Sequence, residues 1–124
     1  MKIIIDGVPF EADIHSIGRG LDFLYKCAER TDDGDLYSEL IGTYPRYKYE
    51  IDCRTPEDYS RLYEKLTEPV PFHDVIVPGT DYDYPFRCYM GSIEDKLVRQ
   101  RNGKNYWSSL TVEFKAKAPN RRPL

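Results

Sequence analysis

The hydrophobic period of this chain changes at Thr55 and Pro56, and the change determines what the flanking segments can become. The apolar residues before it occupy every second position: Tyr47, Tyr49, Ile51 and Cys53. Those after it follow the i, i+3, i+4, i+7 spacing: Tyr59, Leu62, Tyr63 and Leu66. The first pattern places side chains on one face of a strand, and the second places them on one face of a helix. We therefore predict a half-buried strand that leads directly into an amphipathic helix.

Local signals mark the limits of this helix. Thr55 is a favourable N-cap residue, and Pro56 suits the first helical position, where no backbone donor is needed. Two acidic residues follow in the first turn, where the helix dipole favours negative charge. Pro69 cannot continue a helix. The main helix is therefore predicted at about residues 56–67.

A long β-hairpin is predicted around the acidic segment TDDGD at residues 31–35, a strong turn signal. Residues 21–30 alternate only in part, because Leu24 interrupts the polar face, so a short helix remains an alternative there. Glycines at positions 18, 20 and 42 predict bulges or bends in the hairpin. Asn102 and Gly103 predict a second hairpin. Residues 92–100, just before it, fit either a strand or a short helix.

Together these elements predict an α+β fold with roughly six to eight mostly antiparallel strands and one main helix. We expect a β-sandwich or split barrel that carries the long β-hairpin. The chain has 124 residues, enough for one hydrophobic core but too few for two. It is therefore predicted to be a single domain spanning 1–124, in which residues 118–124 form a basic C-terminal tail.

The amino-acid composition limits the kinds of partner, whether nucleic acid, membrane or protein, that the chain is expected to bind. The net charge is −3, which argues against non-specific nucleic-acid binding, since neutralising phosphates needs a basic surface. No apolar run approaches the length of about 20 residues that spans a membrane, and the isoleucines at 3–5 are too few for a signal-peptide core. The eleven tyrosines suit strand faces and also interfaces that are part apolar and part wet. We expect contacts with proteins, and neither membrane association nor specific nucleic-acid binding.

The sequence lacks a recognisable reactive centre. His73 precedes Asp74, but neighbouring residues of a strand point to opposite faces, so Asp74 is poorly placed to orient His73. The cysteines, at positions 27, 53 and 88, are widely separated, which favours small buried side chains over a disulfide framework or a zinc site. The TDDGD segment lacks the later ligands of a calcium loop. We therefore predict no catalytic residues, no metal site and no cofactor.

The order of elements resembles that of small tail structural proteins of siphophages and related prophages of Gram-positive bacteria. The resemblance covers most of the chain, in the segments RYKYEIDC, DYSRLYEKLTEP, FHDVIVPG, FRCYM and YWSSLTVEFKAKAPNRRP. It implies the tail-tube and baseplate-hub fold, a β-sandwich or split barrel flanked by one helix. It further implies ring formation through joined sheet edges, hairpins that reach the next ring, and location in the virion tail, with assembly in the host cytoplasm.

The predicted function is accordingly a non-enzymatic tail component that forms a homo-oligomer, as a ring or stacked rings, and contacts other tail proteins. The alternative is a small monomeric binding or adaptor domain that recognises a protein or nucleic acid through exposed aromatic residues and a basic turn. Acidic loops of one copy would suit basic residues of another. The candidate interaction residues are Asp32, Asp33, Asp35, Tyr82, Tyr84, Arg99, Arg101, Lys104, Trp107, Arg121 and Arg122.

Overall fold

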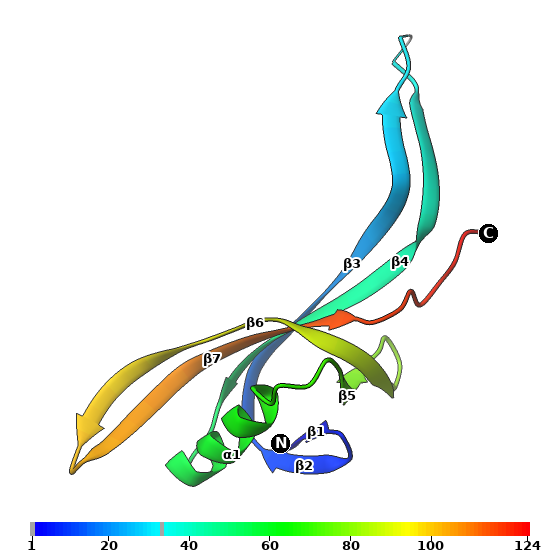
Figure 1. Cartoon of the computed structure of the whole chain (residues 1–124). Helices are drawn as coiled ribbons and strands as arrows, with labels where there is room; N and C mark the ends of the chain where they lie inside the picture. The colour runs from blue at the N-terminus through cyan, green and yellow to red at the C-terminus, as the bar shows by residue number, and fades with distance from the viewer. Residues whose placement is uncertain (1, 33) are drawn as a thin grey trace.

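One antiparallel sheet and one helix make up the structure (Figure 1). The computed structural model describes residues 2–32 and 34–124, leaving aside the side chains of residues 27–29 and 36–38. The elements are β1 (Lys2–Ile5), β2 (Val8–Glu11), β3 (Asp13–Arg30), β4 (Leu36–Asp52), α1 (Pro56–Leu66), β5 (His73–Pro78), β6 (Asp83–Arg101) and β7 (Lys104–Ala116). The strand order is β2-β1-β5-β6-β7-β4-β3, so β2 and β3 form the sheet edges. The mostly antiparallel α+β class is confirmed, with seven strands in the described part of the chain.

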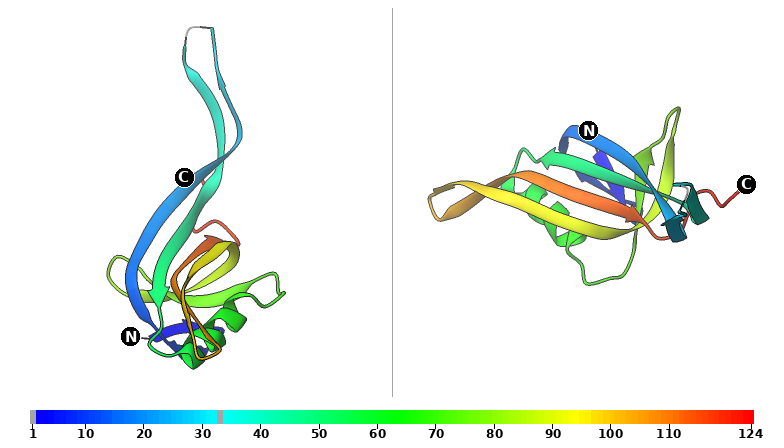
Figure 2. Two further views of the ribbon diagram at one scale, coloured as in Figure 1. Left: turned by 90° about the vertical axis from the view of Figure 1, so that its left-hand side faces the viewer. Right: turned by 90° about the horizontal axis from the view of Figure 1, so that it is seen from above.

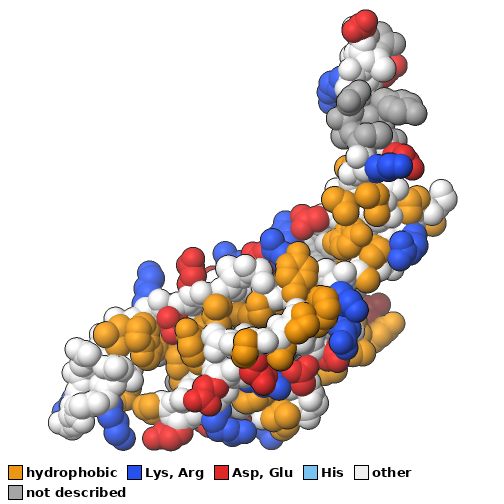
Figure 3. Space-filling model, viewed as in Figure 1, with side chains coloured by type: hydrophobic (Ala, Val, Ile, Leu, Met, Phe, Trp, Pro, Cys, Tyr) orange, Lys and Arg blue, Asp and Glu red, His pale blue; other side chains and the backbone are white. Residues whose placement is uncertain are grey.

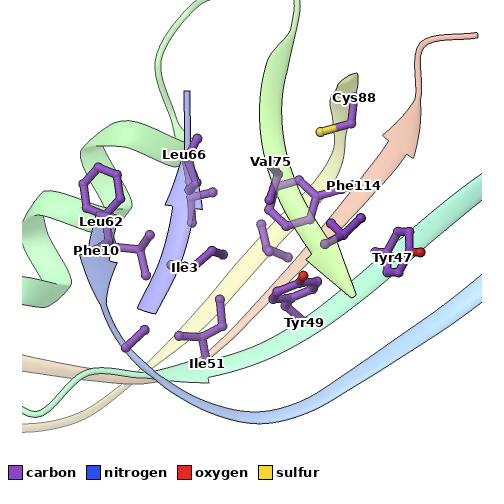
Figure 4. Packing of buried hydrophobic residues seen from close by; sticks show 14 of the residues in the cluster. Ile3, Phe10, Tyr47, Tyr49, Ile51, Leu62, Leu66, Val75, Cys88 and Phe114 are labelled. Carbon is purple, nitrogen blue, oxygen red and sulfur yellow. The ribbon is translucent and has the colours of Figure 1, made fainter. Parts of the chain in front are cut away.

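The hydrophobic core lies on the inner face of this curled sheet (Figure 4). Alternate residues of the central strands are fully buried there: Tyr49, Ile51, Leu110, Val112 and Phe114. The rings of Tyr49 and Phe114 meet edge to face, with their centroids 5.4 Å apart, a favourable geometry for aromatic pairs. The period of two in the sequence therefore marked the core face correctly.

The helix α1 packs against β2 and β7 and begins where the sequence indicates. The Thr55 side chain accepts a hydrogen bond from the backbone N–H of Asp58 at 3.1 Å, which is the expected N-cap interaction. Leu62 and Leu66 are buried, and Tyr59 is nearly so. Tyr63 was expected in the same buried stripe, but it is 38% exposed and its ring stacks on Tyr59. Within the described residues no helix is long and apolar enough to cross a membrane.

Two hairpins extend beyond the body of the sheet in different directions (Figures 1 and 2). β3 pairs with β4 along nearly its whole length, whereas β4 pairs with β7 only at residues 46–51. Residues 21–45 therefore form a two-stranded projection, which we call the long arm. In the same way β6 and β7 continue past the pairing with β4, and residues 95–109 form the short arm.

The long arm confirms the predicted hairpin and resolves the open alternatives. Residues 21–30 and 92–100 are both strand, not helix. Register shifts interrupt the β3/β4 ladder between Ile14 and Ser16, and again on either side of Tyr25. Gly42 pairs with Leu24 at the second of these interruptions, so the glycine signal located one bulge. Asp33, which belongs to the predicted TDDGD turn, lies outside the described residues.

Candidate interaction surfaces

The buried histidine, His73, is held in position by the carboxylate of Asp6. The Nδ1 atom of His73 lies 2.7 Å from Oδ2 of Asp6, and the other carboxylate oxygen of Asp6 accepts the backbone N–H of Asp74 at 2.7 Å. The Lys65 ammonium sits 3.2 Å from Asp6 and 2.8 Å from Glu68. Asp6, Glu68 and His73 are close enough together to suggest a metal site, but the Lys65 ammonium already pairs with both carboxylates. This cluster therefore ties the β1–β2 turn to β5 and α1.

The electrostatics of Asp6 reflect this role. Partial burial acts to raise the pKa of Asp6, but hydrogen bonds from Asp74, His73 and Lys65 outweigh it and lower the pKa to about 2. Burial raises the pKa of the Cys88 thiol to about 12 and that of Cys53 to about 11. These two thiols are therefore protonated at neutral pH, which does not suit a nucleophile.

His15 lies at the surface and pairs with Asp52. Its Nε2 atom is 2.6 Å from Oδ2 of Asp52, whose Oδ1 accepts the backbone N–H of Ser109 at 2.9 Å. The Ser109 hydroxyl lies 3.4 Å from the Ser108 hydroxyl, and among the described residues no hydrogen bond joins it to His15. This arrangement orients a histidine but does not activate a hydroxyl, so it does not form a nucleophile–base pair.

The long arm is the most unusual surface of the molecule. Apolar side chains gather on it, as Figure 3 shows, although it is only two strands thick. They are all exposed by more than a third of their surface: Leu21, Phe23, Leu24, Tyr25 and Ile41. A two-stranded ribbon has no second layer to cover either face, and such ribbons are marginally stable alone. Along the arm, the outer edge of β3 has no neighbouring strand in the described residues.

The basic tail is fastened to the root of this arm. Thr43 donates its backbone N–H to the Arg121 carbonyl at 3.0 Å and accepts the backbone N–H of Asn120 at 3.0 Å. The hydroxyl of Thr43 also donates to Oδ1 of Asn120 at 2.6 Å. Gly42 permits this approach, because a Cβ added there would lie 2.8 Å from both the Arg121 carbonyl oxygen and the Pro119 Cβ. The tail thus forms an isolated antiparallel bridge with β4.

Replacing Gly42 with alanine is expected to detach this tail. The new methyl group would overlap the backbone of Arg121, so the amides of Thr43 and Asn120 should lose their hydrogen-exchange protection, and the unfolding free energy should fall by about 1 kcal/mol. Gly18→Ala is the matched control, because its added Cβ would meet only the Lys48 carbonyl oxygen, at 3.9 Å. Unchanged protection at Thr43 in Gly42→Ala would contradict the assignment.

A pocket of about 380 Å³ lies between the start of α1 and the short arm. Aromatic side chains from both elements form much of its lining: Tyr59, Tyr63, Tyr106 and Trp107. The carboxylate of Asp95 also lines it, and the Tyr59 hydroxyl donates to Oδ2 of Asp95 at 2.6 Å. Burial and this hydrogen bond raise the pKa of Tyr59, which therefore remains a neutral donor. We call these five residues the aromatic pocket.

No protein-family model and no curated protein matches this chain.

The structure distributes the predicted interaction residues over four places. Asp32 and Asp35 lie at the tip of the long arm, while Asp33 lies outside the described residues. Arg99, Arg101, Lys104 and Trp107 lie on the short arm, Tyr82 and Tyr84 flank the start of β6, and Arg121 and Arg122 lie in the tail. Tyr82 is 77% exposed, whereas the Tyr84 hydroxyl is 2.8 Å from that of Tyr47. Of the predicted set, only Trp107 lines the aromatic pocket.

Sequence reasoning missed two groups of residues. The apolar residues of the long arm were read as one face of an ordinary strand, although Leu24 already broke that pattern. Asp95, Tyr59, Tyr63 and Tyr106 were not connected, because they come from a helix and a hairpin that are distant in sequence. The spacing of Tyr59 and Tyr63 on the helix was the one sequence signal for this pocket. The same spacing is equally consistent with packing against the core.

Proposed function

We propose that this chain is a non-enzymatic structural protein of a phage or prophage tail. It would be a tail-tube-like, minor-tail or baseplate component that joins copies of itself and other tail proteins. The observation that supports this most is the long arm, a projecting ribbon with exposed apolar side chains on a chain of this size. Such a ribbon gains stability only when another surface covers it.

The energetics favour assembly through the arm. Full burial of a large apolar side chain contributes about 1.5–3 kcal/mol. Each of the five arm residues retains between about a third and somewhat more than half of its exposure, so covering each one adds about 1 kcal/mol. The sum is about 5 kcal/mol per arm, and strand pairing at an open edge adds to it, so both act in favour of association.

The open edges of the sheet provide the second contact surface of the proposed assembly. Both edge strands, β2 and β3, have an open side in the described residues, and open edges pair readily between subunits. In this proposal the curled sheet is the β-sandwich or split barrel of tail-tube-like proteins, and edge pairing closes it into a ring with neighbouring copies. A net charge of −3 suits a conduit to which DNA does not adhere.

The test is the oligomeric state of the full chain. Sedimentation velocity over about a hundredfold concentration range should show species larger than the monomer that grow with concentration. Negative-stain microscopy of the upper range should show rings or short tubes. A strict monomer throughout, which also fails to bind other tail proteins, would refute the proposal.

A second candidate is a monomeric adaptor domain that uses the short arm. Its support is the gathering of Arg99, Arg101 and Lys104 beside two aromatic residues, with the Arg99 guanidinium 4.4 Å from the Tyr106 ring centroid. Basic residues beside aromatic faces are typical of surfaces that bind single-stranded nucleic acid. Salt-dependent binding of an oligonucleotide by a chain that stays monomeric would favour this candidate over the first.

A further inference from the structure

The aromatic pocket has an incomplete set of interactions. Oδ2 of Asp95 accepts the Tyr59 hydroxyl, but Oδ1 has no partner among the described residues. Trp107 remains 43% exposed, and Tyr63 also presents an exposed ring. The pocket therefore combines a free carboxylate oxygen with several accessible aromatic faces.

This combination favours a cationic group. Aromatic faces attract cations through their quadrupole, and a carboxylate at the same site adds a direct charge interaction. Arg54 also lines the pocket, but its guanidinium lies 3.6 Å from Asp13, which partly neutralises it. A guanidinium fits better than an ammonium, because it is planar, stacks on rings and still donates hydrogen bonds.

The chain itself contains matching groups. Most of its arginines already have a side-chain partner, either a carboxylate, a hydroxyl, a carbonyl or an aromatic ring. In the described residues three have none: Arg101, Arg121 and Arg122. Arg101 is located at the tip of the short arm, beside the pocket. The adjacent pair Arg121 and Arg122 is therefore the uncommitted guanidinium pair that lies elsewhere among the described residues.

This pair cannot reach the pocket of its own chain. The bridge between Thr43 and Arg121 holds the tail at the root of the long arm. Figures 1 and 2 show the tail and the tip of the short arm at opposite ends of the molecule. An occupant from this segment must therefore come from a second copy.

We propose that the aromatic pocket of one copy binds the arginine pair of the tail of a second copy. A guanidinium of Arg121 or Arg122 donates to the free oxygen of Asp95 and stacks on Trp107. The contact joins two different surfaces, so it is heterologous and propagates into a ring or a filament. It rests on the proposed function, since it specifies one joint of that self-assembly.

Trp107 provides a direct test, because it is the only tryptophan of the chain. The full chain at low concentration is titrated with a capped peptide of residues 116–123, AKAPNRRP, and tryptophan fluorescence is recorded. We expect a saturable change with this peptide and none with its Arg121→Gln/Arg122→Gln counterpart. Asp95→Asn should weaken binding by about tenfold or more, as measured in parallel by calorimetry.

Asp95→Asn is compared with a control variant, Glu94→Gln, which alters the neighbouring carboxylate. Asp95→Asn retains an oxygen that accepts the Tyr59 hydroxyl, so the pocket keeps its shape while it loses its charge. Glu94→Gln removes the neighbouring carboxylate, which does not line the pocket, and should bind as the unaltered chain does. Circular dichroism of both variants verifies that they are folded.

Equal binding of the two peptides, or unchanged binding by Asp95→Asn, would overturn the proposal. Sedimentation then separates it from the proposed function. If Asp95→Asn still assembles like the unaltered chain, the arm-mediated assembly stands and only the pocket assignment fails. If the peptide binds but the full chain is monomeric at every concentration, the second copy is not the occupant, and the proposed function fails as well.

Discussion

Replacing Phe23 and Leu24 with serine is expected to weaken self-association by about thirtyfold. The two residues are consecutive on β3, so they occupy opposite faces of the long arm, and both are about half exposed in the single chain. At about 1 kcal/mol for each covered side chain, the two replacements forfeit about 2 kcal/mol, which corresponds to that change in affinity. Sedimentation velocity of the variant and the unaltered chain measures the effect.

The same substitution should leave the fold intact, because neither side chain belongs to the core cluster. The melting temperature is therefore expected to change by no more than about 2 °C. Lys26→Ser is the matched control, since it alters an exposed polar residue of the same strand and should assemble normally. Unaltered association of the Phe23→Ser/Leu24→Ser chain would show that the long arm is not an assembly surface.

The second large effect is expected at Asp6, whose replacement with alanine should lower the unfolding free energy by about 3 kcal/mol. Among the described residues, Nε2 of buried His73 already lacks a hydrogen-bond partner, so the loss of Asp6 would leave both ring nitrogens without one. The backbone amide of Asp74 would lose its acceptor too. Asp6 also has a φ of 52°, which alanine adopts less readily than aspartate or asparagine. Denaturant titration at neutral pH measures the change.

The pH dependence gives an independent check on Asp6. Its pKa is lowered in the folded chain from 3.8 to about 2, so the ionised carboxylate stabilises the fold above about pH 4 and that stabilisation is lost as the pH falls towards 2. The side chain is partly exposed, so the expected loss is about 1 kcal/mol. Asp6→Asn should flatten the stability profile in this window.

Asp74→Asn is the control for both measurements. Asp74 pairs with Arg87 at 3.2 Å, but both side chains are more than half exposed, and such pairs contribute at most about 1 kcal/mol. A cost for Asp6→Ala no greater than that for Asp74→Asn would contradict the role assigned to the Asp6 cluster.

The sequence correctly predicted those structural elements that are determined by residues close together in the chain. The N-cap at Thr55, the turn at Asn102 and Gly103, and the alternation from Leu110 to Phe114 each depend on neighbouring residues, and the structure reproduces all of them. Asn102 and Gly103 both have positive φ, as a two-residue hairpin turn of this type requires. Residues 21–30 were ambiguous because a ribbon exposed on both faces need not alternate.

The candidate sites were less predictable, because they depend on contacts between distant segments. Asp95 and Tyr59 are 36 residues apart, and their hydrogen bond follows from the packing of α1 beside the short arm. In the same way, Asp74 was judged unable to orient His73, but nothing in the sequence indicated that Asp6, 67 residues away from His73, would do so. Chemistry assembled across a sheet is set by strand order, which local patterns do not determine.

The long arm has no flexible loop at its base, since β3 and β4 pass from it into the body as continuous strands. Its direction is therefore set by the twist of two strands and by the irregular pairing around Tyr25 and Gly42. In the assembly that we propose, the repeat distance and the pitch would depend on this irregular pairing. One inserted or deleted residue there would change the symmetry of that proposed assembly without altering any contact within the core.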